Sequence, residues 1–268
     1  MEGDTHFMRK RAACAGLLIS LGILFAGSGS VWAQSDVIQT SKGDLRITPI
    51  HHASLMLQFG GKVIYVDPVN RGDYTGKPKA DIIILTHEHG DHMNRAKIDD
   101  LESPHMVIIG PECVTLARIV PEAERIYYGE KKTFSGIEIE AVPAYNLTRG
   151  PEPGKLFHPK NIPHDVDGYA CDDAGRGNGY VLTLGGKRLY ISGDTECIPE
   201  MKALRNIDVA FVSMDPRYTM TPGEAAECVN SFKPKIVYPY HYGQSNLEEF
   251  SSAVKGTPVV EVRLRKWY

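Results

Sequence analysis

One short stretch constrains this chain more than any other: a run of imidazoles and carboxylates directly after an apolar strand. Residues 81–85, Asp-Ile-Ile-Ile-Leu, read as a strand that is covered on both faces. Residues 86–92 follow at once with Thr-His-Glu-His-Gly-Asp-His. Such a density of nitrogen and oxygen ligands is typical of a metal site, and ligands of α/β proteins bind at this rim of the sheet. The alternative is a solvated loop that happens to be rich in histidine.

The spacing of these side chains favours two neighbouring cations. His87 and His89 are two positions apart, so on an extended or turning backbone they project to the same side. Gly90 allows a sharp turn, after which Asp91 and His92 face a second point. One motif can therefore supply ligands to two metal ions.

The pattern His-x-His-x-Asp-His resembles the signature of the metallo-β-lactamase superfamily, here at 87–92. Asp194, in a Gly-Asp-Thr that follows an apolar strand, resembles the bridging aspartate of that superfamily. His241 lies in a loop between the strand at 235–240 and a helix, at the same sheet rim, where the final metal histidine is expected. Asp67, at the end of the strand at 62–66, resembles an aspartate that accepts a hydrogen bond from a ligand histidine. A plain strand-ending turn is the alternative for Asp67.

The resemblance extends over the mature chain and is to the branch with ascorbate-6-phosphate lactonase-like hydrolases and, more distantly, N-acyl-phosphatidylethanolamine phospholipase D. It implies an α/β fold, the αββα sandwich, in which two mixed β-sheets lie between helices. The strand and helix signals along the chain fit two such halves. We expect strands at 44–48, 54–59, 62–66, 81–85, 106–109, 137–142, 179–184, 187–192, 208–214 and 235–240. We expect helices at 97–101 and 111–120, after a capping box at Thr221 and Glu224, and after Ser245 with Glu248.

The chain departs from the superfamily at the end of the strand at 137–142. Asn146 stands where a third histidine for the first metal is usual, and an amide is a poor zinc ligand. We expect His158 to supply the missing imidazole, while Asn146 contacts metal, water or substrate; His164 is a weaker substitute. Otherwise the first metal keeps only two histidines and binds weakly.

The resemblance implies one ligand set for each of two divalent cations. These sets are His87, His89 and His158 or Asn146 for the first, and Asp91, His92 and His241 for the second, with Asp194 as the bridge. Zinc suits these ligands best, and manganese and iron are alternatives. The expected reaction is hydrolysis by a metal-bound hydroxide, with Asp91 orienting the water. A lactone, ester, amide or phosphodiester bond all suit this chemistry.

Substrate choice is expected to lie in loops. The segment 150–179 is rich in Pro, Gly, Asp and His, and we expect it to form a flap over the metals. His52 resembles a residue that lines the mouth of the site in this branch, although a structural histidine is equally consistent. Tyr218 and Tyr242 are expected to contact a small-molecule substrate, and aromatic packing is the alternative.

Two other functions are alternatives to a dinuclear hydrolase. If Asn146 has removed the first metal, the protein is a mononuclear iron redox enzyme of the persulfide-dioxygenase type. The other is a non-catalytic, exported binding protein on the same fold. Metal identity and stoichiometry separate these alternatives from a dinuclear hydrolase.

The first 33 residues have the pattern of a secretory signal peptide. A basic flank at 9–11 precedes an apolar stretch at 12–26, and Val-Trp-Ala at 31–33 suits cleavage after Ala33. An uncleaved membrane anchor is the alternative, but the stretch is shorter than the roughly 20 residues of a spanning helix. We therefore expect export to the periplasm or the medium, and a hydrolase domain at 34–268 with no stable membrane span.

Charge and cysteine content add two expectations. The net charge of −3 gives no basic surface, which argues against a nucleic-acid partner. Four cysteines remain after cleavage: Cys113, Cys171, Cys197 and Cys228. Their scattered spacing matches no disulfide framework, so we expect buried free thiols, although pairing is possible in an oxidising compartment.

Overall fold

The computed structural model describes residues 1, 35–116, 120–160, 177–254 and 260–268. Its contacts separate residues 1–32 from one compact unit, Ala33–Tyr268, which contains the whole fold described below. Apart from Met1, the predicted signal peptide and its cleavage point lie outside the described residues.

The first sheet has seven strands in sequence order. They are β1 (Asp36–Thr40), β2 (Gly43–His51), β3 (Ser54–Phe59), β4 (Lys62–Val66), β5 (Ile82–Ile84), β6 (Val107–Gly110) and β7 (Glu124–Arg125). Strands β1 to β4 pair antiparallel and β4 to β7 pair parallel, so the sheet is mixed.

The second sheet also has seven strands and runs in the order β14-β13-β12-β11-β10-β9-β8. They are β8 (Lys131–Phe134), β9 (Ile137–Ala144), β10 (Gly177–Leu184), β11 (Lys187–Ile191), β12 (Val209–Ser213), β13 (Ile236–Tyr240) and β14 (Glu261–Val262). Here β8 to β11 pair antiparallel and β11 to β14 pair parallel. Each half therefore repeats the same antiparallel-then-parallel plan.

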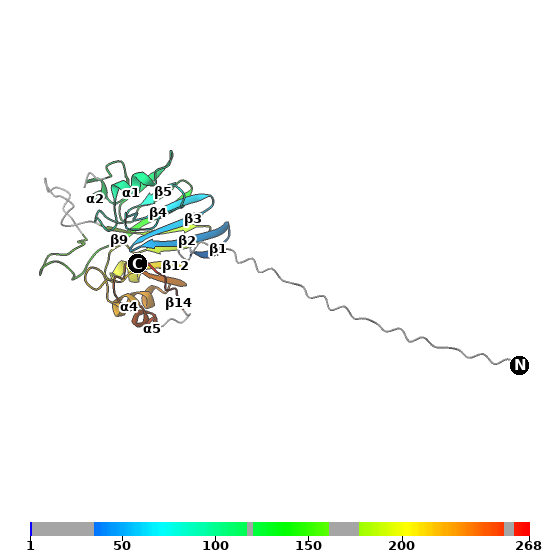
Figure 1. Ribbon diagram of the computed structural model, residues 1–268. Coiled ribbons are helices and arrows are strands. Elements are labelled where there is room, and N and C mark those ends of the chain that lie inside the picture. Colours follow the sequence, from blue (N-terminus) through cyan, green and yellow to red (C-terminus); the bar gives the residue numbers. More distant parts are fainter. Residues whose placement is uncertain (2–34, 117–119, 161–176, 255–259) are drawn as a thin grey trace. The chain divides into compact units, whose positions relative to one another are not determined.

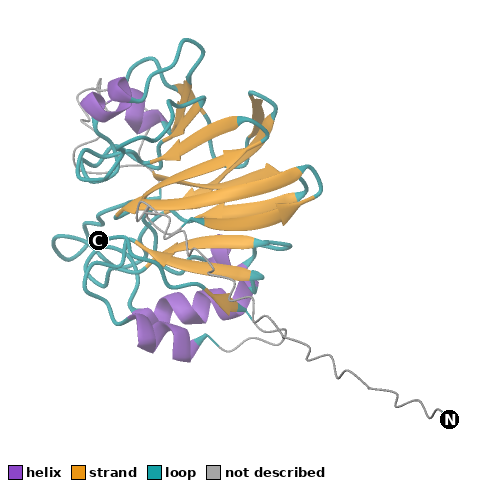
Figure 2. Ribbon diagram, turned by 45° about the vertical axis from the view of Figure 1, so that its right-hand side comes forward, coloured by secondary structure: helices purple, strands orange, loops and turns teal. Residues whose placement is uncertain are grey.

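The helices lie on the outer faces of the two sheets, as Figures 1 and 2 show. Beside the first sheet are α1 (Arg95–Asp100) and α2 (Glu112–Leu116), and beside the second are α3 (Pro199–Lys202), α4 (Pro222–Phe232) and α5 (Leu247–Ala253). Apolar residues of both sheets share one buried core between them, and each outer face has its own core under its helices. The architecture is the predicted αββα sandwich.

Most predicted elements are found, with local differences. The capping box of α4 is present, with Thr221 as N-cap and Glu224 as its reciprocal partner. The predicted cap of α5 is wrong: Asn246 accepts the N–H of Glu248 at 3.0 Å, whereas the hydroxyl of Ser245 donates to the carbonyl of Met214. Sequence signals missed the short elements β1, β7, β8, β14 and α3. The predicted helix at 111–120 is described as far as Leu116.

The expectation of free thiols is wrong for two cysteines. Cys197 and Cys228 form a disulfide across 31 residues, with their Cα atoms 5.5 Å apart. The pairing arises because α4 packs over the loop that follows β11 and brings the two residues together. Cys113 is buried, as expected, and Cys171 lies outside the described residues. Within the described ranges, no helix is long and apolar enough to cross a membrane.

Candidate metal centre

The carboxyl ends of several strands from both sheets meet at one edge of the sandwich. In the first sheet, β4 leads to Asp67 and β5 leads into the motif at 86–92. In the second sheet, β9 leads to Asn146, β11 to Asp194 and β13 to His241. Parallel directions place these ends at a common rim, which is where ligands of α/β sheets bind. Side chains that are far apart in the sequence therefore meet here.

Three imidazoles form a first cluster at this rim. One ring nitrogen from each of His87, His89 and His158 lies within 4.8 Å of the other two. Nδ1 of His89 is 3.1 Å from Nε2 of His87 and 3.3 Å from Nε2 of His158. His87 and His158 are buried, whereas His89 is half-buried. The structure thus brings the predicted His158 to the two histidines of the motif.

A second cluster lies beside the first. Ligand atoms of His52, Asp91, His92 and His241 lie within 4.8 Å of one another. The carboxylate of Asp194 stands between the two clusters: Oδ1 is 3.4 Å from Nε2 of His92, and Oδ2 is 3.2 Å from Nε2 of His241.

Oδ2 of Asp194 is also 3.8 Å from Nε2 of His158. This single carboxylate therefore reaches imidazoles of both clusters. Ligand atoms of His87, from the first cluster, and of His92, from the second, also lie within 4.8 Å of each other and of a carboxylate oxygen of Asp194.

The polar atoms at the centre of this arrangement fit divalent cations. Nε2 of His92, Nε2 of His241 and Oδ1 of Asp194 are buried and have no hydrogen-bond partner among the described residues. Buried polar atoms without partners are costly, so such atoms need a ligand. Imidazole nitrogens and a carboxylate that converge in this way are the donors that zinc and related metals take in proteins.

Electrostatics keep several of these imidazoles neutral. Burial, with the neighbouring histidines His92 and His89, holds the pKa of His87 well below its usual value. Burial lowers the pKa of His158 to about 3. A neutral imidazole presents the free lone pair that a metal requires. These two histidines are therefore ready to bind a cation at neutral pH without first losing a proton.

Asp194 is a buried carboxylate that keeps its negative charge. Burial alone would raise the pKa of its carboxyl, but His241 and His92 outweigh burial and hold this pKa well below the ordinary value. In the same way, Asp194 and Asp67 outweigh burial at His92 and raise the pKa of that imidazole. The centre therefore contains a carboxylate that stays ionised when buried.

Asp67 contacts a histidine of the centre, as its position directly after β4 predicts. Its buried carboxylate accepts the backbone N–H and the hydroxyl of Thr86, each at 2.7 Å, and lies 2.8 Å from Nδ1 of His92. A proton on Nδ1 leaves Nε2, which lies beside Asp194, as the nitrogen available to a metal. Thr86, which sequence analysis missed as a site residue, also places its hydroxyl 3.0 Å from Nδ1 of His87.

Asn146 contacts a histidine rather than joining either donor cluster. Its Oδ1 lies 2.7 Å from Nδ1 of His158 and accepts the backbone N–H of the same residue at 2.8 Å. Its Nδ2 donates to the carbonyl of Tyr218 at 2.8 Å. Both Asn146 and His158 are 1% exposed, so this contact is sealed from water.

Glu196 is a second residue that sequence analysis missed. It is buried and accepts the backbone N–H groups of Thr148 at 3.1 Å and Arg149 at 2.7 Å. The guanidinium of Arg149 lies 3.3 Å from the same carboxylate and bonds Glu224 of α4. Glu196 thus ties the segment that carries Asn146 to the loop that carries Asp194. Its position two residues after Asp194 is the one feature of the sequence that could have indicated a role near the centre.

His52 lies at the mouth of the centre with a strained backbone conformation. Its φ of +57° is in the left-handed region, which a non-glycine residue adopts only when its surroundings enforce it. Nδ1 of the ring is 2.7 Å from the hydroxyl of Tyr268, and Nε2 is 3.2 Å from Oδ2 of Asp91. The ring centroid is 3.8 Å from that of His241. Sequence analysis missed Tyr268, which is 216 positions away.

The other predicted substrate residues lie around the rim. Tyr218 is half-buried and packs edge-to-face on Phe157 with ring centroids 5.1 Å apart. Tyr242 is half-buried too, and its hydroxyl donates to the carbonyl of Arg265 at 3.2 Å. His164 and most of the predicted flap at 150–179 lie outside the described residues.

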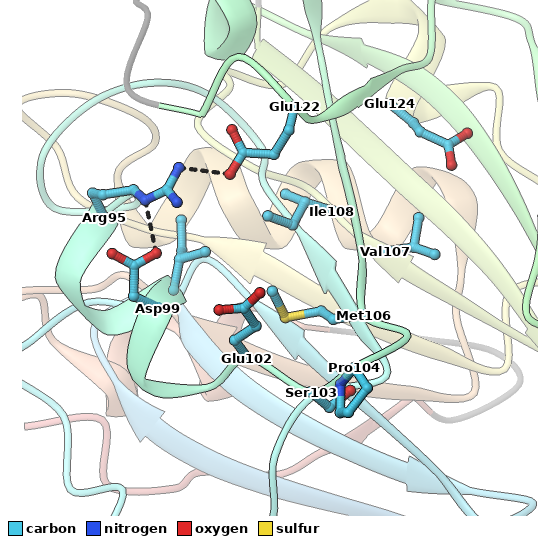
Figure 3. Close-up of a pocket in the computed structure, with 11 residues that line it drawn as sticks. Arg95, Asp99, Glu102, Ser103, Pro104, Met106, Val107, Ile108, Glu122 and Glu124 are labelled. Carbon is cyan, nitrogen blue, oxygen red and sulfur yellow. Dashed lines mark hydrogen bonds and ion pairs between the residues drawn. The ribbon is translucent and has the colours of Figure 1, made fainter.

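Two cavities are lined by parts of the motif or of α1. One of 440 Å³ opens onto His52 and Asp91. The other, of 260 Å³, lies beside α1 and β6 and is shown in Figure 3, where Arg95 bonds both Asp99 and Glu122. None of the clustered histidines lines this second cavity, so the first is the one that serves the metal centre.

Comparisons with known proteins agree with this geometry. The beta-lactamase superfamily domain matches residues 46–241. A UPF0173 metal-dependent hydrolase of Pelotomaculum thermopropionicum is 29% identical over 234 residues, which cover 82% of this chain and 96% of the relative. A crystal structure assigned as a metal-dependent hydrolase from Parabacteroides distasonis is 42% identical, with a TM-score of 0.74, and covers 87% of this chain and 99% of that one.

The fold also matches more distant structures. The metallo-beta-lactamase fold protein YhfI from Bacillus subtilis has a TM-score of 0.58 at 13% identity, over 81% of this chain and 89% of that chain, and so shares the fold. The matched domain covers more than half of the present sequence and includes the motif, Asp194 and His241. This chain therefore belongs to the metallo-β-lactamase superfamily.

Proposed function

We propose that this protein is a metal-dependent hydrolase that binds two divalent cations. The observation that carries the proposal is the buried carboxylate of Asp194, which lies between two clusters of imidazoles and has one oxygen without a hydrogen-bond partner among the described residues. Relatives named metal-dependent hydrolases support the reaction class. Zinc is the favoured metal because imidazole and carboxylate are its usual ligands, and manganese and iron are the alternatives.

Each cation has its own set of ligands in this proposal. His87, His89 and His158 would hold the first, Asp91, His92 and His241 the second, and Asp194 would contribute to both. Cations bound here would lower the pKa of a water toward neutrality and would polarise a carbonyl or phosphoryl oxygen.

The residues around the cations orient the reaction. Asp91, half exposed to the cavity, accepts a hydrogen bond from the attacking water and directs it toward the substrate. His52 donates to Asp91 and fixes the direction of that carboxylate. The buried imidazoles of His87 and His158 close the other side of the centre to solvent. The bond that is cleaved is then a lactone, ester, amide or phosphodiester.

Substitution at the bridge tests the proposal. We expect Asp194→Ala and His241→Ala to lower bound metal, measured by elemental analysis, and to abolish hydrolysis of a panel of lactone, ester, amide and phosphodiester substrates with added zinc or manganese. Glu102→Gln is a matched control, since this exposed carboxylate lines the other cavity. Full activity in the Asp194→Ala, His241→Ala double variant would refute the proposal.

Other functions fit the site less well. A mononuclear redox enzyme would fit if Asn146, in place of a histidine, left the first metal with two imidazoles. The grouping of His158 with His87 and His89 instead supports a third imidazole for that metal. One iron per chain in the isolated protein would favour the redox enzyme. A non-catalytic binding protein would bind metal normally and hydrolyse no member of the panel.

We also propose that the protein is exported and works in the periplasm or medium on a small molecule. The signal-like residues 1–33 and the Cys197–Cys228 disulfide support this, because disulfides persist in oxidising compartments. The net charge of −3 argues against nucleic acid as the partner. Cell fractionation with N-terminal sequencing tests it, and mature protein in the cytoplasm with an intact N-terminus would contradict it.

A further inference from the structure

The cavity that opens onto the metal centre is of a size for a small ligand, and most of the residues that line it have side chains with polar atoms. Its volume is 440 Å³, within the range of about 300–1,000 Å³ that is common for small-molecule sites. His52 and Asp91, which belong to the second cluster, line this cavity together with His51 and Arg71. Val69 is the only aliphatic side chain among the described residues that line it.

The positive charge in the cavity lining comes from Arg71. Its guanidinium is exposed and, within the described part of the chain, has neither a hydrogen bond nor an ion pair with a carboxylate. Asp91 is the one carboxylate in the cavity lining, and its hydrogen bond to His52 turns it toward the metal side. Arg71 therefore offers its planar set of donors to whatever enters the cavity.

His51 adds a second polar group beside Arg71. His51 is half-buried and lines the same cavity, so its ring can contribute a hydrogen bond to a ligand there. The planar guanidinium of arginine is the usual group for recognition of a carboxylate or phosphate, because it forms charge-assisted hydrogen bonds with either.

We propose that this cavity binds an anionic group, a carboxylate or a phosphate, at the far end of a small substrate, and that Arg71 selects such substrates. The inference rests on the proposed hydrolase function and adds the class of substrate. With the anionic group at Arg71, the rest of the molecule extends across the cavity and its reacting bond lies beside Asp91. The substrate is then a hydrophilic ester, lactone, amide or phosphodiester with a free negative charge.

Three matched substrates test the inference on the metal-loaded protein. These are the 4-nitrophenyl esters of hexanoate, of adipate and of 5-phosphonopentanoate, which differ only in a methyl, carboxylate or phosphonate end. We expect wild type to prefer at least one anionic ester. Arg71→Met should lower the ratio of kcat/KM for that ester to kcat/KM for the hexanoate ester by about 10- to 100-fold, as loss of a charge-assisted hydrogen bond predicts. The preferred anion tells carboxylate from phosphate.

Controls separate the possible outcomes. Arg71→Lys should restore part of the preference, and Arg46→Met, an exposed arginine of β2 outside the cavity lining, should leave the ratio as in wild type. A ratio unchanged by Arg71→Met overturns the inference. If wild type cleaves none of the esters, the hydrolase proposal fails for this bond type. Calorimetric titration with adipate and with inorganic phosphate then decides the site: binding lost in Arg71→Met supports it, and binding equal in both proteins overturns it.

Discussion

Oδ1 of Asn146 lies 2.7 Å from Nδ1 of His158, and the same oxygen accepts the backbone N–H of His158 at 2.8 Å. The acceptor places the ring proton on Nδ1 and leaves the lone pair of Nε2 facing His89, 3.3 Å away. An asparagine at this position therefore orients an imidazole that comes from 12 residues further along the chain.

Loss of either partner should weaken the first metal site. We expect His158→Ala to lower the bound metal by about one equivalent per chain. We expect Asn146→Ala to lower metal affinity by about 10- to 100-fold, because partners that orient a ligand have effects of that size. Elemental analysis and competition with a chelator measure both. Unchanged stoichiometry in His158→Ala would show that His158 binds no metal.

The contact between Tyr268 and His52 should affect turnover more than folding. The Tyr268 hydroxyl donates to Nδ1 of His52, so Nε2–H is left to donate to Asp91. Removing one hydrogen bond of about 0.5–1.5 kcal/mol in Tyr268→Phe should lower kcat by about 2- to 10-fold, with KM little changed. The test compares kcat and KM in wild type, Tyr268→Phe, His52→Ala and the double variant. Additive losses of the two changes would argue against a shared role.

The disulfide should contribute much of the stability of the second half. Cross-linking residues 31 apart lowers the entropy of the unfolded chain, which corresponds to about 3–4 kcal/mol. We expect the free energy of unfolding of the Cys197→Ser, Cys228→Ser double variant to fall by about that amount in urea titrations. Wild type with a reductant should approach the double variant, and the double variant should not respond to the reductant. A response in both would point to another thiol.

Asp36 should make the stability of the protein depend on pH in acid. Its carboxylate accepts two hydrogen bonds from Arg265, at 2.7 and 2.9 Å, and one from Tyr238 at 2.9 Å. Burial alone would raise the pKa of Asp36, but these contacts and the charges of Arg265 and Arg263 outweigh it, so the pKa is below its ordinary value of 3.8.

A carboxyl with a lowered pKa in the folded state stabilises the fold above its unfolded pKa, and this stabilisation is lost as the pH falls through the folded pKa. We expect Asp36→Asn to lower the free energy of unfolding at pH 7, with a difference from wild type that shrinks below about pH 3.8. Urea titrations between pH 2 and 7 measure it, with Glu102→Gln as the control. A difference that is constant with pH would mean that the ion pair contributes nothing.

Signals within a few residues of one another predicted the local parts of this protein. The apolar strand and the ligands at 86–92 are neighbours on the chain, and so are Gly-Asp-Thr at 193–195 and the capping box of α4, with Thr221 and Glu224. Each signal depends on backbone and side-chain preferences over a few residues, which a reader of the chain can recognise. The two-sheet fold followed from the order of such signals together with the resemblance to the superfamily.

The packing of the two sheets decides which distant residues meet. It selected His158 for the imidazole cluster and turned Asn146 toward it, it brought Tyr268 to His52, and it paired two cysteines that we expected to be free. The local context of these residues carries no mark of their partners, because such contacts arise when loops from opposite sheets pack at one rim. Their geometry depends on the packing of the whole sandwich.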